Sequence, residues 1–191
     1  LVGSYNHDVI ALASEYIGAR RLPVKLVTIG KTGRDAMLEQ GHTIHADFHL
    51  PDTARITEIT PVARVLLDGF TGRLFEEVLI AYTQSRSRAR SQPVVQPLLP
   101  IRSVAPAEAR EYVYEPSPQE LLMILLPRLI RFQIYQAFLE ALVAENVSRM
   151  MAMHAATQNA SELIRHLTIS YNKARQQAIT AEIVDIMTAI R

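Results

Sequence analysis

The chain has 191 residues, of which 49% are hydrophobic and 20% charged, and its formal net charge at pH 7 is +1. This composition is that of a globular protein, and the near-zero charge argues against a strongly basic nucleic-acid-binding protein. The lack of cysteine excludes disulfides, thiolate metal sites and thiol redox switches. The longest apolar run, Leu121–Leu126, is too short to span a bilayer. With neither an initiator Met nor a signal-peptide pattern, the chain is expected to start inside a longer gene product.

The first part of the chain predicts alternating helices and strands. Helical spacing predicts helices at 5–18, 32–40 and 57–70, and β-branched or alternating runs predict strands at 24–29, 43–48, 77–82 and 93–99. The prolines of the last strand favour a place at a sheet edge. This order predicts a small layered α/β domain, which we place at residues 1–112.

Glycine and proline are confined to the first two thirds of the chain. All seven glycines precede position 73 and the last proline is Pro127, so nothing after it interrupts a helix. The composition of this last part favours one very long helix, about 95 Å at 1.5 Å per residue. We therefore place a long coiled-coil helix at residues 113–191.

The start of the long helix carries a capping signal. Ser117 stands at the N-cap, Pro118 at the first helical position and Glu120 at the third, which together form a capping box. Pro127 follows about two and a half turns later, where a proline removes a backbone hydrogen bond. The sequence therefore predicts a bend or a helix restart at Pro127.

Apolar side chains follow a coiled-coil spacing along the long helix. These residues, called the seam below, are Leu125, Leu129, Phe132, Leu139, Val143, Met150 and Met153, with a second group at Ile179, Ile183, Ile186 and Ile190. A single helix does not bury such a seam alone, and no other segment here is long enough to cover it. The sequence therefore predicts a partner helix outside this chain.

Two motifs resemble ligand sites but are better explained by the fold. Gly30-Lys31-Thr32 follows a predicted strand, as the end of a P-loop does, but Lys25 stands where a P-loop needs its first glycine. A tight turn between strand and helix is the favoured role of these glycines. A second motif comprises His42, His45 and His49. On a strand the first two point to opposite faces, so a zinc site is not predicted.

Arg86, Arg88 and Arg90 alternate with small residues and would share one strand face. Such a face can bind phosphate or an acidic partner, but a solvated edge that resists aggregation is favoured. The sequence as a whole contains neither a paired-carboxylate site nor a GxSxG nucleophile elbow. It therefore predicts no catalytic residues, cofactor or metal.

A dense polar block, residues 171–177, interrupts the apolar pattern near the end of the helix. Asn172, Gln176 and Thr180 recur every four residues beside Arg175, which places them on one ridge. From the residues alone a solvent-facing stripe is the favoured interpretation. The alternative is a docking ridge that offers hydrogen bonds to a partner.

The same block resembles a family signature. The run from Tyr171 to Gln176, with Ile179-Thr180 and Glu182, is similar to the C-terminal motif of the gamma subunit of the F-type ATP synthase, its central rotor shaft. Similar stretches run the length of the chain, at 3–6, 96–100, 112–116, 133–136 and 150–159. The resemblance implies an α/β, Rossmann-like three-layer domain that binds no nucleotide, followed by half of an antiparallel coiled coil. It also implies that an N-terminal helix and a first strand precede Leu1.

The resemblance further implies contact residues and partners. Arg175, Gln176 and Thr180 match positions that contact the catch loop of the beta subunit. Tyr112, Tyr114 and Glu115 match the foot, which lies near the epsilon subunit and the c-ring. Ile183, Ile186 and Ile190 match the apolar bearing at the top of the alpha and beta subunits.

The implied function is mechanical: a non-catalytic shaft that couples proton-driven c-ring rotation to ATP synthesis in the beta subunits. The implied location is the cytoplasmic face of the bacterial inner membrane, or its organellar equivalent, with membrane contact only through the c-ring and no nucleic acid. Two alternatives from other classes remain. One is a free-standing α/β ligand-binding or enzyme domain, against which the lack of a catalytic or ligand motif argues. The other is a coiled-coil scaffold with an α/β spacer, which would self-associate instead of binding alpha and beta subunits.

Overall fold

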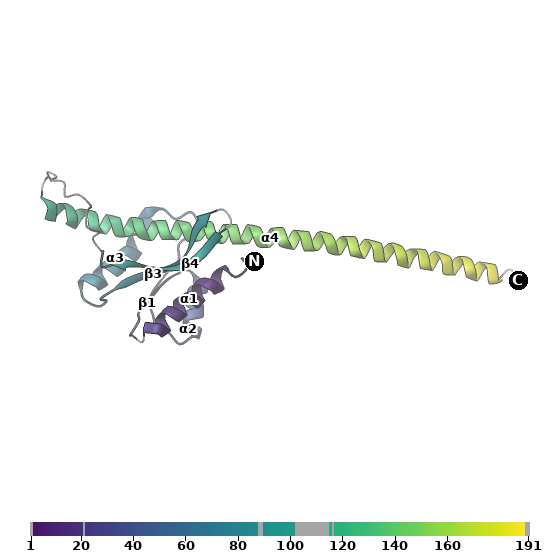
Figure 1. The fold of residues 1–191 in the computed structure, drawn as a ribbon, viewed down its shortest axis with the longest axis horizontal. Coiled ribbons are helices and arrows are strands. Elements are labelled where there is room, and N and C mark those ends of the chain that lie inside the picture. Colours follow the sequence, from purple (N-terminus) through teal and green to yellow (C-terminus); the bar gives the residue numbers. More distant parts are fainter. Residues whose placement is uncertain (1, 21, 88–89, 102–114, 116, 190–191) are drawn as a thin grey trace. The chain divides into compact units, whose positions relative to one another are not determined.

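The computed structural model describes residues 2–20, 22–87, 90–101, 115 and 117–189. Figure 1 shows its helices and strands. The helices are α1 (Tyr5–Arg20), α2 (Lys31–Glu39), α3 (Thr60–Thr71) and α4 (Pro118–Ala189), with a short 3-10 helix, η1 (Ile56–Ile59), before α3. The strands are β1 (Leu26–Ile29), β2 (Ile44–Phe48), β3 (Val78–Ser87) and β4 (Arg90–Leu99). Each predicted element is present, and the strands at 77–82 and 93–99 are longer than predicted.

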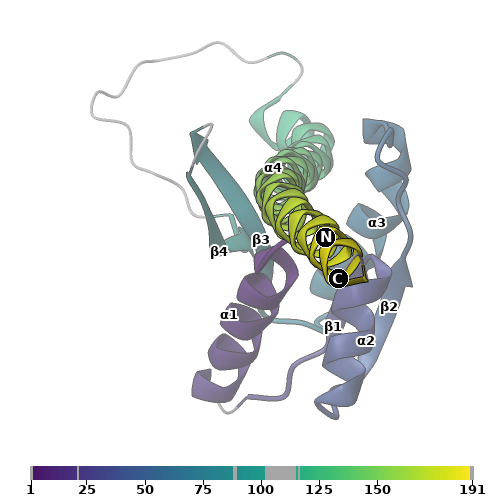
Figure 2. The same ribbon diagram turned by 90° about the vertical axis from the view of Figure 1, so that its right-hand side faces the viewer.

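The strands pair in two sets. β1 and β2 are parallel, with Leu26 opposite Ile44 and Ile29 opposite Phe48, whereas β3 and β4 form an antiparallel hairpin. Among the described residues, no ladder joins the two pairs. In the view of Figure 2, α1 lies beside the hairpin and α2 beside the β1–β2 pair, in agreement with their contacts. The α/β fold class is thus as predicted, although its strands do not form one continuous ladder.

The core lies between the hairpin, α3 and the first part of α4. Its largest fully buried side chains are Ile59 of η1, Val62 of α3, and Ile130 and Ile134 of α4, each at most 2% exposed. Val78, Leu98 and Leu99 contribute the strand side of the same cluster. The start of α4 is therefore part of the α/β unit and not a separate element.

The turn after α3 depends on a close approach at Gly69. A Cβ atom at this position would lie 2.0 Å from Cε2 of Phe75, which is far inside van der Waals contact. The backbone N–H groups of Leu74 and Phe75 both donate to the Gly69 carbonyl, at 2.8 and 3.2 Å. Glycine is required here because the chain folds back directly over its own helix.

α4 begins as the capping signal predicts, since the Glu120 backbone N–H donates to Ser117 Oγ at 3.3 Å. The predicted restart at Pro127 is wrong, because the helix continues through this proline without a break. Proline lacks one donor and crowds one turn, but the neighbouring turns retain their own hydrogen bonds. The loss of one bond is therefore not enough to end a helix whose next turns are fixed by the core.

The chain divides into two compact units, residues 2–148 and residues 149–191. The boundary falls inside α4, whereas the boundary predicted at 112/113 lies among residues that the structure does not describe. In the second unit every described side chain from Met153 to Ala189 is exposed.

By length and composition alone, α4 could cross a membrane: an 18-residue window of it has a mean hydropathy of 1.3 and is 17% buried. Its apolar character thus extends beyond the short run at 121–126. The core helix of a soluble protein passes the same test, so this observation is weak evidence for a membrane span.

Candidate docking face of the long helix

Two apolar faces run along the first part of α4. One is buried in the core and contains Ile130, Ile134, Ala137 and Ala144. The other is the predicted seam, on which Leu125, Phe132 and Val143 are 51%, 55% and 51% exposed. Phe132 follows Ile130 by two residues, or about 200° of helical rotation, so the two faces point in opposite directions. The seam therefore lies open in the described structure.

A groove of about 280 Å³ follows the seam beside β3. Its walls are formed by Ser85, Phe132, Tyr135, Gln136, Leu139, Glu140 and Val143. Most of these residues belong to α4 and recur every three or four positions. This spacing places them on one face of the helix, where a second helix can pack against them. The groove is thus suited to an elongated apolar partner.

Two of the residues that line this groove, Gln136 and Glu140, are polar, although the surface that the groove exposes is apolar. Gln136 Nε2 donates to Glu140 Oε1 at 3.0 Å. The second carboxylate oxygen of Glu140, Oε2, is buried and has no hydrogen-bond partner in the described structure. The sequence interpretation did not identify this pair. Its only signal is Gln136 itself, which occupies a seam position seven residues after Leu129 and seven before Val143.

One tyrosine hydroxyl bonds α1 to this stretch of α4, and a second tyrosine hydroxyl forms a hydrogen bond within the β3–β4 hairpin. Tyr5 Oη of α1 donates to the Ala141 carbonyl at 3.0 Å. Burial, with a contribution from the Glu145 carboxylate, raises the pKa of Tyr5 to about 12. Tyr82 Oη of β3 donates to Gln96 Oε1 at 3.2 Å, and burial followed by the Glu140 charge raises its pKa. Both hydroxyls therefore stay protonated at neutral pH and can serve as donors.

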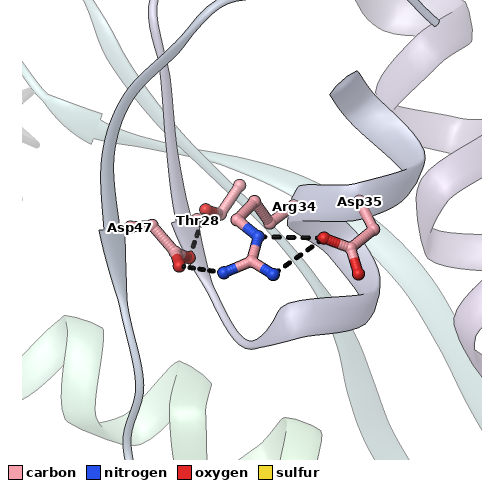
Figure 3. Close-up of polar contacts among 4 residues, drawn as sticks. All are labelled: Thr28, Arg34, Asp35 and Asp47. Atoms are coloured by element: carbon pink, nitrogen blue, oxygen red, sulfur yellow. Dashed lines mark hydrogen bonds and ion pairs between the residues drawn. The ribbon is translucent and has the colours of Figure 1, made fainter. Parts of the chain in front are cut away.

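The carboxyl ends of β1 and β2 carry an ionic network, drawn in Figure 3. Asp47 accepts from Thr28 Oγ1 at 2.7 Å and from Arg34 Nη1 at 3.0 Å, while Arg34 Nε also donates to Asp35 at 2.9 Å. The Thr28 hydroxyl and then Arg34 hold the pKa of Asp47 below its usual value. The two carboxylates raise the pKa of Arg34.

This edge is where doubly wound α/β folds bind nucleotides. Gly30, at a φ of 101°, turns the chain from β1 into α2, as the sequence predicts, and its N–H donates to the Phe48 carbonyl at 2.9 Å. Asp35 and Asp47 place negative charge beside the turn and engage the nearby Arg34. The network thus ties β1, β2 and α2 together and opposes the approach of a phosphate.

The structure describes all three histidines of the sequence motif, His42, His45 and His49. His45 packs edge-on against Phe75, with ring centroids 5.6 Å apart and an interplanar angle of 86°. Within the described ranges no three His, Asp or Glu residues are placed to hold a metal ion.

The polar ridge predicted at the far end of α4 is exposed. Arg175, Gln176 and Thr180 all face solvent, and Thr180 Oγ1 donates to the Gln176 carbonyl at 2.8 Å. This bond occupies the hydroxyl proton and leaves its lone pairs available.

The remaining predicted contact residues are described only in part. Ile183 and Ile186 are exposed, whereas Ile190 lies outside the described residues. Glu115 is exposed, while Tyr112 and Tyr114 also lie outside the described part of the chain. The same is true of the side chains of Arg86, Arg88 and Arg90.

Comparison with known proteins gives a consistent result. A family model described as ATP synthase matches residues 1–191. The chain is 41% identical to an ATP synthase gamma chain from Roseiflexus sp. (strain RS-1), covering 97% of this chain and 66% of that relative. It is 40% identical to an ATP synthase gamma chain from Dehalococcoides mccartyi (strain CBDB1), covering 90% of this chain and 61% of the relative. The chain thus spans slightly less than two thirds of the length of these relatives.

Solved structures share the fold at low sequence identity. The central stalk and c-ring structure of the Tetrahymena thermophila mitochondrial ATP synthase matches with a TM-score of 0.66 and 17% identity, covering 82% of this chain and 70% of that chain. A structure of the Euglena gracilis mitochondrial ATP synthase matches with a TM-score of 0.65 and 15% identity, covering 94% and 66%.

Proposed function

Because this chain belongs to the ATP synthase gamma-chain family, we propose that it is the main part of a central rotor shaft. In this role it couples proton-driven rotation of a c-ring to ATP synthesis in catalytic beta subunits. The chain performs no bond chemistry itself and needs no cofactor. The observation that carries the proposal is the open seam on α4, opposite its core face, in a chain shorter than its relatives.

The open seam supports pairing with a second helix of the same protein. A shaft must resist bending and torsion, and two paired helices are stiffer than one. We propose that an N-terminal helix, in the part of the relatives that this chain does not cover, lies antiparallel on the seam. The strand that precedes β1 in the complete domain would also lie in that part, and it would join the β1–β2 pair to the β3–β4 hairpin.

The polar ridge is the proposed contact with the beta-subunit catch loop. Arg175 and Gln176 present donors and an acceptor without an apolar anchor, which suits contacts that form and break in every turn. To bias the beta subunits, each rotary position must favour one conformation by a few kcal/mol. A small number of charge-assisted hydrogen bonds, each worth about 1.5–3 kcal/mol, is enough for such a bias.

The two ends of the chain supply the remaining proposed contacts. Ile183, Ile186 and Ile190 form the upper bearing within the alpha and beta subunits. Tyr112, Tyr114 and Glu115 form the foot that contacts the epsilon subunit and the c-ring. The shaft is then a peripheral membrane protein, at the cytoplasmic face of a bacterial inner membrane or the equivalent organellar membrane.

Co-purification of the complete subunit with alpha and beta subunits tests this proposal. The ridge variant is Arg175→Ala with Gln176→Ala, and the matched control is Arg165→Ala with Gln158→Ala on the same exposed helix. All three proteins should form the complex, and ATP turnover should fall only in the ridge variant. Loss of one charged contact of about 1.4–2.8 kcal/mol in the rate-limiting state corresponds to a fall of about 10- to 100-fold.

Two other outcomes would contradict parts of the proposal. Equal ATP turnover in the ridge variant and its control would reject the proposed catch-loop contact and show that these side chains only face solvent. Self-association of the subunit, without binding to alpha and beta subunits, would favour the coiled-coil scaffold instead.

A further inference from the structure

The Tyr5 side chain joins two elements that lie far apart in the sequence. Its hydroxyl, at the start of α1, donates to the backbone carbonyl of Ala141 in α4 at 3.0 Å. The side chain is half-buried, and burial raises the pKa of Tyr5 to about 12, so the hydroxyl keeps its proton at neutral pH. Thr83 of β3, which is 5% exposed, lies close to the same hydroxyl and offsets part of this rise. Tyr5 therefore lies where α1, β3 and α4 meet.

The apolar contacts of α4 become smaller towards the same place. On the core face, Ile130 and Ile134 fill the cluster shared with α3 and the hairpin, but the next buried residues on this face are Ala137 and Ala144. An alanine side chain buries far less apolar area than an isoleucine, so it holds a helix in place less firmly. The Tyr5 bond falls in this alanine stretch, about 10 Å along the helix axis from Ile134.

A helix needs two separate anchors to resist a sideways force. Every described side chain from Met153 to Ala189 is exposed, so among the described residues a force on this part of α4 is resisted by contacts within residues 2–148. One apolar cluster alone acts as a pivot, because apolar contacts have no preferred direction. A hydrogen bond weakens steeply as its angle and distance change, so a bond placed away from the cluster opposes both tilting and rotation of the helix.

We propose that Tyr5 is a positioning residue for rotary coupling, which fixes α4 in the α/β unit through its bond to the Ala141 carbonyl. The inference rests on the proposed function in one respect, namely that α4 carries torque. Because the acceptor belongs to the backbone, any rotation or sliding of the helix moves it away from the hydroxyl. Without this bond α4 yields under load, and part of each rotary step is lost within the subunit.

Tyr5→Phe in the complete subunit, assembled into the complete complex in sealed vesicles, tests this role. Phenylalanine keeps the aromatic ring and removes only the donor. The matched control is Thr28→Val, which removes a hydroxyl that donates to Asp47 at 2.7 Å within the β1–β2 pair. One readout is the number of protons pumped per ATP hydrolysed. The other is the rate of hydrogen exchange at the backbone amides of residues 141–148.

Loss of one hydrogen bond favours a loosened state about fivefold. Exchange at residues 141–148 should therefore speed up about fivefold in Tyr5→Phe, while exchange at Ile130 and Ile134 stays unchanged, because the loosening is local. The number of protons pumped per ATP should fall in Tyr5→Phe and keep its wild-type value in Thr28→Val. ATP hydrolysis should continue in both variants.

Three results would overturn the role of Tyr5. An equal loss of pumping in both variants would indicate a general loss of stability. Faster exchange in Tyr5→Phe with unchanged pumping would make the bond purely structural, and unchanged exchange would show that Tyr5 does not hold α4. A wild-type complex that hydrolyses ATP without pumping protons would instead reject the proposed function, and hydrogen exchange would still decide whether Tyr5 anchors the helix.

Discussion

Truncation of Ile134 offers a quantitative test of the core face of α4. Ile134 is 1% exposed and packs in the cluster formed by α3, the hairpin and α4. Burial of an isoleucine side chain stabilises a protein by about 1.5–3 kcal/mol, and the cavity left after truncation raises the cost of Ile→Ala to about 2–5 kcal/mol. We therefore expect Ile134→Ala to lower the free energy of unfolding by about 3 kcal/mol.

Urea unfolding of the wild type and the variant, followed by circular dichroism, measures this loss. For a domain of this size, about 3 kcal/mol corresponds to a fall in Tm of about 6–12 °C. Asn146→Ala is the control, because Asn146 lies on the same helix but is exposed. A loss below about 1 kcal/mol for Ile134→Ala would show that this part of α4 is not packed on the α/β domain, and would refute the assignment of two opposite faces.

Three further changes test other parts of the structure. Gly69→Ala should cost about 2 kcal/mol of stability, because the new Cβ atom would overlap Phe75, and a cost near zero in urea unfolding would contradict this close approach. Asp47→Asn should make the free energy of unfolding fall less steeply in acid. The lowered pKa of Asp47 gives the wild type stability that is present above the unfolded-state pKa of 3.8 and is lost as the pH falls through the pKa of the folded state. Tyr5→Phe should remove the hydrogen bond to Ala141, at a cost of about 1 kcal/mol, and flatten the alkaline limb between pH 10 and about 12. In wild type that contribution is complete below pH 10 and is lost as Tyr5 ionises, so an unchanged alkaline limb in the variant would contradict the buried donor.

The sequence predicts the local structure well because its signals are themselves local. Ser117 and Glu120 mark the helix start, and Gly30 marks the turn from β1 into α2. The helix restart predicted at Pro127 is wrong for a tertiary reason, since the core contacts of Ile130 and Ile134 lie just beyond this proline. A local propensity is overridden where packing fixes the neighbouring turns.

Pairing and polar contacts depend on long-range neighbours and are less accessible from the sequence. The spacing of the seam identifies an open face of α4, but it does not show that Ile130 and Ile134 form a second apolar face. The pattern also does not reveal that Glu140 has a buried oxygen without a donor, because that depends on β3 and on the rotamer of Gln136. The division of the strands into two pairs likewise depends on hydrogen-bond partners far apart in the chain.

The central claim is that this chain turns inside a ring of alpha and beta subunits. Single-molecule observation tests it most directly: the ring is fixed to a surface, and a probe is attached at the exposed Glu115 position of the complete subunit through an introduced cysteine. The absence of native cysteine in residues 1–191 leaves this part of the protein free of competing sites. During ATP hydrolysis the probe should rotate in one direction, in discrete steps. ATP hydrolysis at a normal rate with a stationary probe would contradict the rotor assignment.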